Sequence, residues 1–164
     1  MRIGTKMLLF GSHNIIVHSF FTLLGWIVFF RSLPSIKEFV CIVLHDIGYW
    51  GCEKIDGGDG DEHPYRGALI AARLFGNKYY DLCIFHSATI ARFHDRHVSK
   101  LYYADKMGWL LMPNWLLYFF VRVSGEIEFY KEYKMHRIAG GFRVKNFKNH
   151  IRENLEREEF RPIV

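Results

Sequence analysis

The chain has 164 residues, half of them hydrophobic and 17% aromatic, and carries a formal net charge of +5. This length predicts one domain with room for a substantial core, and the apolar content excludes disorder as the main state. The three cysteines, Cys41, Cys52 and Cys83, lie far apart, which argues against a zinc ribbon or a disulfide framework and indicates a reducing, cytoplasmic setting.

The first strong feature is an uncharged run at residues 7–30, which is long enough to cross a bilayer. The run contains polar side chains that are costly in lipid, so we expect a buried core helix rather than a membrane span. We expect residues 1–11 to form a short lead-in and Ser12 to cap a helix that ends near Phe30.

Two histidines lie on this expected helix. His13 and His18 are five positions apart and point about 140° from each other, so they are poorly placed to serve one site together. His13 would lie in the fraying first turn, whereas His18 lies more than a turn inside. Because a ligand needs rigid support, we favour His18 as a metal ligand over His13. The alternative is that both are core histidines bonded to backbone carbonyls.

The second helix ends in an adjacent His-Asp pair. Ser35 and Glu38 form a capping box, which predicts a helix from about Ile36 into His45 and Asp46. Neighbouring residues on a helix project about 100° apart, so both heads can reach one point just beyond the helix end. An imidazole beside a carboxylate suits a metal that takes nitrogen and oxygen ligands.

A glycine- and acid-rich loop follows at residues 52–62, and its spacing does not fit a twelve-residue calcium loop. Such a loop is usually flexible and solvated, but between two candidate ligand sites it could also form the mouth of a pocket. His63 and Pro64 then begin a third helix. Gly67 and Ala68, one turn later, would let another helix or a metal site approach the backbone closely.

Two further candidate ligands come from the next helices. We expect a helix at about residues 79–93 with His86 on its apolar face, where a histidine is more often a satisfied core residue. Ser99 is expected to cap a fifth helix that carries Asp105 in an apolar context, where a carboxylate is costly unless it is paired or bound to a metal. Adjacent helical residues do not face each other, so we favour metal binding by Asp105 over pairing with Lys106.

Most of the net charge lies at the end of the chain. Residues 129–164 contain nine Lys or Arg and five Glu, and Gly140-Gly141 is expected to split them into two helical pieces. We expect a core at residues 1–125 and a basic helical extension at residues 126–164 that packs on the same domain. Such a helix is most often a solvated face; a basic surface for anionic lipid or nucleic acid is the alternative, and no nucleic-acid motif is recognisable.

Together, these residues resemble a family. The chain is similar to the HD superfamily of metal-dependent phosphohydrolases in the order of six residues, His18, His45, Asp46, His63, His86 and Asp105. The contexts H-D-I-G, H-x-x-x-G-A and A-D-K are similar as well, and the match extends from His18 to Lys106. The longer strings L-H-D-I-G-Y-W-G and S-G-E resemble a small bacterial subgroup of these proteins.

The resemblance implies an all-α HD-domain helical bundle with a charged C-terminal helical extension. It also implies a metal held by His18, His45, Asp46 and Asp105, with Asp46 bridging to a second ion held by His63 and His86. Imidazole and carboxylate ligands suit one or two divalent transition metals such as Fe, Mn, Ni, Co or Zn. Many relatives carry a lysine after the H-D-I-G motif, where this chain has Tyr49.

The activity that the resemblance implies is hydrolysis of a phosphate ester. A metal-bound hydroxide, with Asp46 at the centre, would attack a small and nucleotide-like substrate, and Lys106 or Arg92 would steady the developing charge. Three alternatives remain open: a di-iron oxygenase of the same family, a non-catalytic module that binds metal or nucleotide, and a membrane-attached form. We expect no specific nucleic-acid partner, and the sequence leaves the oligomeric state open.

Overall fold

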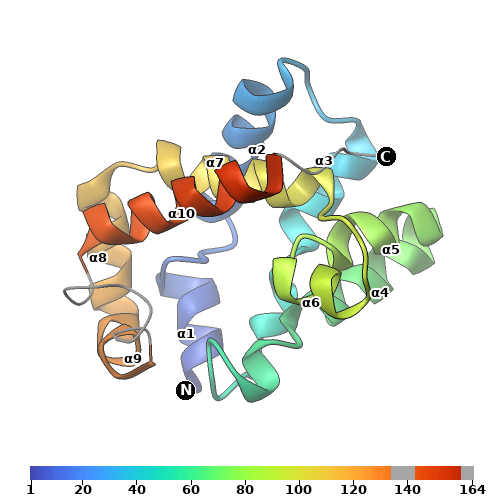
Figure 1. Ribbon diagram of the computed structural model, residues 1–164. Coiled ribbons are helices and arrows are strands. Elements are labelled where there is room, and N and C mark those ends of the chain that lie inside the picture. Colours follow the sequence, from blue (N-terminus) through green and yellow to red (C-terminus); the bar gives the residue numbers. More distant parts are fainter. Residues whose placement is uncertain (134–142, 160–164) are drawn as a thin grey trace.

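The protein is described by a computed structural model, shown in Figure 1, for residues 1–133 and 143–159. These residues form ten α-helices and two short 3-10 helices and contain no strand, which confirms the all-α class. The α-helices are α1 (Ile3–Phe10), α2 (Val17–Phe30), α3 (Ile36–Leu44), α4 (His63–Phe75), α5 (Asn77–Ile84), α6 (Ala88–Phe93), α7 (Lys100–Leu111), α8 (Asn114–Ser124), α9 (Glu126–Tyr133) and α10 (Val144–Glu159). The 3-10 helices span Ile47–Tyr49 and Gly58–Gly60.

The centre of the bundle is the packing of α2 against α7, the most extensive contact between two elements of the described chain. Glycines on both helices allow the two backbones to approach closely. A Cβ on Gly25 of α2 would lie 2.2 Å from the carbonyl oxygen of Ala104, and one on Gly108 of α7 would lie 2.8 Å from the backbone of Phe21. Neither position can therefore accept a larger side chain without separating the helices.

Two apolar clusters flank this contact. One joins α3, α4 and α5 to the α2–α7 pair through side chains such as Ile42, Ala68 and Leu101. The other joins α7, α8 and α10 through side chains such as Trp109 and Ile151. Figure 1 shows α10 lying beside α7 across one face of the bundle. The charged C-terminal segment thus has one apolar face, by which it packs on the core.

The start of the chain differs from the sequence-based expectation. Residues 3–10 form helix α1 rather than a lead-in, and α2 begins at Val17 rather than after Ser12. The side chain of Ser12 donates instead to the buried carboxylate of Glu126. Asn14 takes over the capping role, because its Oδ1 accepts from two backbone N–H groups at the start of α2, each at 3.1 Å.

The expected continuous helix at residues 79–93 is also wrong. The chain breaks between α5 and α6, and His86 lies in this break rather than on a helical face. Ser87 begins α6, since its Oγ accepts from the backbone N–H of Ile90 at 3.4 Å. Ser99 precedes α7, but its hydroxyl donates to a carbonyl of α5 at 2.7 Å instead of capping the helix. Polar side chains at these junctions compete with helix continuation.

Other expected signals are confirmed. The capping box before α3 is complete, with the Ser35 N–H donating to Glu38 at 2.7 Å and the Glu38 N–H donating to the Ser35 hydroxyl at 3.3 Å. Helix α4 begins at His63 and ends before Gly76. The expected break at Gly140-Gly141 lies outside the described residues. None of the helices in the described part of the chain has the length and apolar character needed to cross a membrane.

Candidate metal centre

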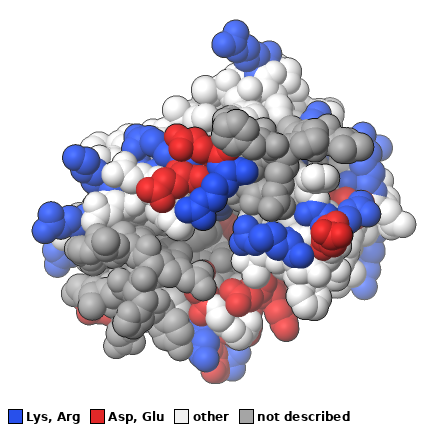
Figure 2. Space-filling model, in the orientation of Figure 1, with Lys and Arg blue, Asp and Glu red and all other residues white. Residues whose placement is uncertain are grey.

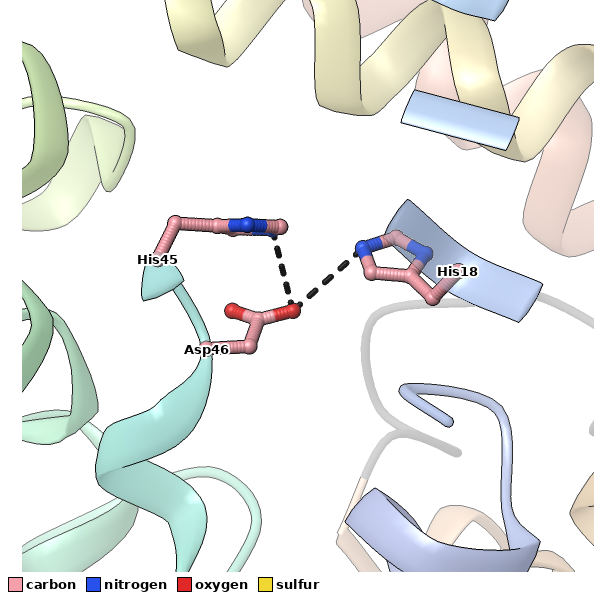
Figure 3. A group of neighbouring side chains, drawn as sticks. All are labelled: His18, His45 and Asp46. Carbon is pink, nitrogen blue, oxygen red and sulfur yellow. Dashed lines mark ion pairs between the residues drawn. The ribbon is translucent and has the colours of Figure 1, made fainter. Parts of the chain in front are cut away.

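The carboxylate of Asp46, just after the end of α3, lies at the centre of the site. Its Oδ2 is 3.1 Å from Nε2 of His45 and 3.3 Å from Nε2 of His18, as Figure 3 shows. Its Oδ1 is 3.5 Å from Nε2 of His63 and 3.5 Å from Nε2 of His86. One carboxylate therefore faces two pairs of imidazoles, with one pair at each oxygen.

Three of these imidazoles are oriented by the backbone. The Nδ1 atoms of His45 and His63 each lie 2.7 Å from the carbonyl oxygen three residues earlier, and Nδ1 of His86 makes the same contact at 2.5 Å. A carbonyl can only accept, so Nδ1 carries the proton and the Nε2 lone pair faces Asp46. This is the orientation that a metal-binding histidine needs.

The first ligand group has buried polar atoms that no hydrogen bond satisfies among the described residues: Nε2 of His18, Nε2 of His45, Oδ2 of Asp46 and Oδ1 of Asp105. Oδ1 of Asp105, from α7, lies 3.0 Å from Nε2 of His18, so all four atoms converge on one region. Buried polar atoms normally have a partner, and a cation would satisfy all of these at once.

The residues fit two metal positions. Ligand atoms of His18, His45 and Asp46 form one mutually close group, and those of Asp46, His63 and His86 form another, each within 4.8 Å. Asp46 belongs to both groups, and Asp105 adjoins the first through His18. The structure thus brings together all six residues that the sequence put forward as ligands, and the buried cluster can hold metal ions of the kind that nitrogen and oxygen ligands prefer.

Burial and the nearby charges shift the pKa values of several residues in the site. Burial lowers the pKa of His63 to about 3 despite the nearby Asp46. Burial also acts to lower the pKa of His18, but the carboxylates of Asp105 and Asp46 outweigh it and raise the pKa to about 9. Burial opposes ionisation of Asp46, yet the adjacent imidazoles, His45 first, hold its pKa well below the usual value. A proton on His18 therefore occupies the place that a metal would take.

Asp105 pairs with Lys106, contrary to the expectation from the sequence that these adjacent residues would not face each other. Lys106 does reach its neighbour, because its long side chain bends back and places Nζ 2.7 Å from Oδ2 of Asp105. Burial opposes the charge on Lys106, but Asp105 outweighs it and raises the pKa of the ammonium group. Asp105 thus has one oxygen toward His18 and the other toward a lysine.

The second imidazole pair depends on tight packing. The ring of Tyr49 stacks on His63 with centroids 3.9 Å apart. A Cβ on Gly67 would lie 2.3 Å from the carbonyl oxygen of Leu44, so only glycine allows α4 this close to the end of α3. The expectation that Gly67 permits a close helix approach is confirmed. The ring of Tyr49 therefore supports a candidate ligand.

His13 lies outside both ligand groups, in the loop before α2. Its ring is 5.2 Å from His18, 5.2 Å from Tyr49 and 4.9 Å from Trp109, centroid to centroid. Its Nδ1 is 3.0 Å from Oγ of Ser12, whose hydroxyl donates to the carboxylate of Glu126. The serine oxygen then accepts from Nδ1–H, which leaves the other ring nitrogen of His13 as an acceptor.

Glu126 was missed as a structural partner of the site, because the sequence placed it at the start of a charged tail. It is fully buried and also accepts from the backbone N–H of Ser12 and the hydroxyl of Ser124, each at 2.7 Å. No local sequence pattern around Glu126 contains this long-range contact. Glu126 ties α9 to the loop that carries His13.

A pocket of about 450 Å³ opens onto the site. The two positively charged candidates, Arg92 of α6 and Lys106 of α7, both line it, together with Asp46 and Asp105. The acidic loop also contributes Asp56, which supports its interpretation as a pocket wall. Figure 2 shows Lys and Arg side chains beside Asp and Glu side chains near the middle of this face. The pocket therefore reaches the candidate metal centre through Asp46, His63, His86 and Asp105.

The sequence did not predict the part of this pocket that α10 forms. Five residues of α10 line it: Phe147, His150, Ile151, Asn154 and Arg157. The signal was present, because Phe147, Ile151 and Leu155 repeat at helical spacing and are buried. The high charge of the segment instead favoured the interpretation as a solvated face.

No family model, curated protein or solved structure matches this chain. The function is therefore inferred from the chemistry of the site.

Proposed function

We propose that the protein is a metal-dependent phosphohydrolase of the HD type, which hydrolyses a phosphate ester of a small, nucleotide-like substrate. The observation that carries the proposal is the position of Asp46, whose two oxygens face two separate pairs of imidazoles. A carboxylate between two nitrogen-rich groups is the arrangement expected of a ligand that bridges two cations.

Six residues would hold the ions. His18, His45, Asp46 and Asp105 would hold the first, and Asp46 with His63 and His86 would hold the second. Divalent ions bound there would polarise a phosphoryl oxygen and lower the pKa of water.

The charged residues of the pocket favour an anionic substrate. Lys106 keeps its positive charge at neutral pH because Asp105 raises its pKa, although burial opposes this. Its Nζ also lies 5.4 Å from the ring centre of Tyr102, which fixes the ammonium group beside the site. Lys106 and Arg92 would neutralise charge on the phosphate group. A neutral substrate, such as an oxygenase of this family would use, makes no use of these cations.

The test begins with metal content, measured by elemental analysis of wild type, Asp46→Ala and His13→Ala. We expect about two equivalents of a transition metal in wild type, a near-complete loss in Asp46→Ala, and retention in His13→Ala, since His13 lies outside both groups. Protein loaded with each metal is then screened for phosphate release. Iron-dependent oxygen consumption without phosphate release would overturn the proposal in favour of an oxygenase.

A further inference from the structure

Helix α10 runs antiparallel to α7 along the pocket. The ring of Phe147 lies 5.5 Å from that of Trp109, centroid to centroid, near the C-terminal end of α7. Seven residues later, the carbonyl of Asn154 accepts from the hydroxyl of Tyr102, near the N-terminal end of α7, at 3.4 Å. The helix is anchored further by Lys148, whose Nζ donates to two carbonyls at the end of α7.

This alignment places the residues of α10 at defined levels along the pocket. Phe147 contacts Trp109, and Asn154 contacts Tyr102. Residues 150–151 therefore lie beside Asp105 and Lys106, at the level of the candidate metal centre. Arg157 lines the same pocket about two helical turns farther on. At a rise of about 1.5 Å per residue, it lies roughly 10 Å along α10 from that level.

The far end of the pocket therefore has its own recognition chemistry. Arg157 of α10 lines the pocket there. A guanidinium group matches phosphate oxygens with paired hydrogen-bond donors. The pocket volume of about 450 Å³ lies in the range of pockets that enclose a whole small molecule rather than a single phosphate group.

We propose that α10 selects the substrate, and that the substrate class is an elongated bisphosphate. One phosphate reacts at the metal centre, and the second binds Arg157 at the far end of the pocket. Asn154 lines the α10 wall between these two positions. This inference rests on the proposed phosphate-ester function and adds a substrate class to it.

The test compares two ligands that cannot be hydrolysed at an ester bond, hexylphosphonate and hexane-1,6-bisphosphonate, by calorimetric titration of the metal-loaded protein. Arg157→Gln removes the charge at the far end, and Arg157 is an exposed side chain whose replacement leaves the core intact. Arg152→Gln is the matched control, because Arg152 is on the same helix, exposed, and bonded to Asn149 at 2.8 Å outside the pocket.

We expect wild type and Arg152→Gln to bind the bisphosphonate about tenfold or more tightly than the monophosphonate, and Arg157→Gln to lose this preference while binding the monophosphonate normally. Equal binding of both ligands by wild type overturns the inference about α10, as does a preference that survives in Arg157→Gln or is lost equally in Arg152→Gln. Failure of wild type to bind hexylphosphonate overturns the phosphate-ester function itself.

Discussion

Raising the pH of the metal-free protein should destabilise it through one residue, His18. The pKa of its imidazole is about 9 in the folded chain, against 6.5 for an ordinary histidine, because Asp105 and Asp46 outweigh the effect of burial. The folded state therefore holds a proton that the unfolded state loses between these two values. The stabilisation is complete below pH 6.5 and disappears as the pH rises through 9.

The expected loss is about 3.5 kcal/mol, from a pKa difference of 2.5 at about 1.4 kcal/mol for each pKa unit. Urea unfolding of chelator-treated protein at several pH values between 6.5 and 9.5 measures it. His63 stays neutral in the folded chain across this range, since burial lowers its pKa to about 3, so it does not contribute. His18→Gln is the control and should remove most of the pH dependence, because the raised pKa values of the Cys52 and Cys83 thiols contribute only near the upper end of this range.

The metal affinity of the protein should change with pH in the opposite direction to its stability, because of the same proton on His18. A metal must displace the proton on His18, so the apparent affinity for the first ion should rise about tenfold per pH unit from 7 until it levels near 9. An affinity that is constant from pH 7 to 9, together with unfolding free energies that do not change with pH, would refute the reasoning. Either His18 would then be neutral in the free protein, or it would not be a ligand.

Three further predictions concern the packing around the site, each measured by urea unfolding. Gly67→Ala should cost about 3 kcal/mol and lower metal occupancy, because the new Cβ would overlap the carbonyl of Leu44; unchanged stability and occupancy would refute the steric argument. Glu126→Ala should cost about 3 kcal/mol, since the N–H and hydroxyl of Ser12 lose their buried acceptor; a loss below about 0.5 kcal/mol would contradict it. Lys148→Met should cost about 2 kcal/mol, because the carbonyls at the end of α7 lose a charged donor; this reading fails if the variant is as stable as wild type.

Local signals predicted much of the fold. The capping box at Ser35 and Glu38 and the His63-Pro64 start of α4 depend on residues within one turn of each other, and both are present in the structure. The errors occurred where a distant partner competes for a side chain. Ser12 is a good N-cap by type, but Glu126, 114 residues away, takes its hydroxyl. No local pattern contains that contact.

The candidate ligands could be selected from the sequence because a buried polar side chain without a partner is energetically unfavourable. Histidine and aspartate side chains within apolar segments need partners, and His18, His86 and Asp105 each stood in such a segment. The orientation of His86 was not predictable, because it depends on the break between α5 and α6. The α10 wall was missed for a different reason, since a helix can be charged overall and still present a pocket-lining face.

The two candidate ligand groups depend on different helix pairs. Close packing of α2 on α7, which Gly25 and Gly108 permit, brings His18 and Asp105 within 3.0 Å. The second group depends on the approach of α4 to the end of α3. Of the residues in the two groups, only Asp46 is common to both. The centre is therefore complete only when both helix pairs are packed, so metal binding must stabilise the folded chain by favouring both contacts at once.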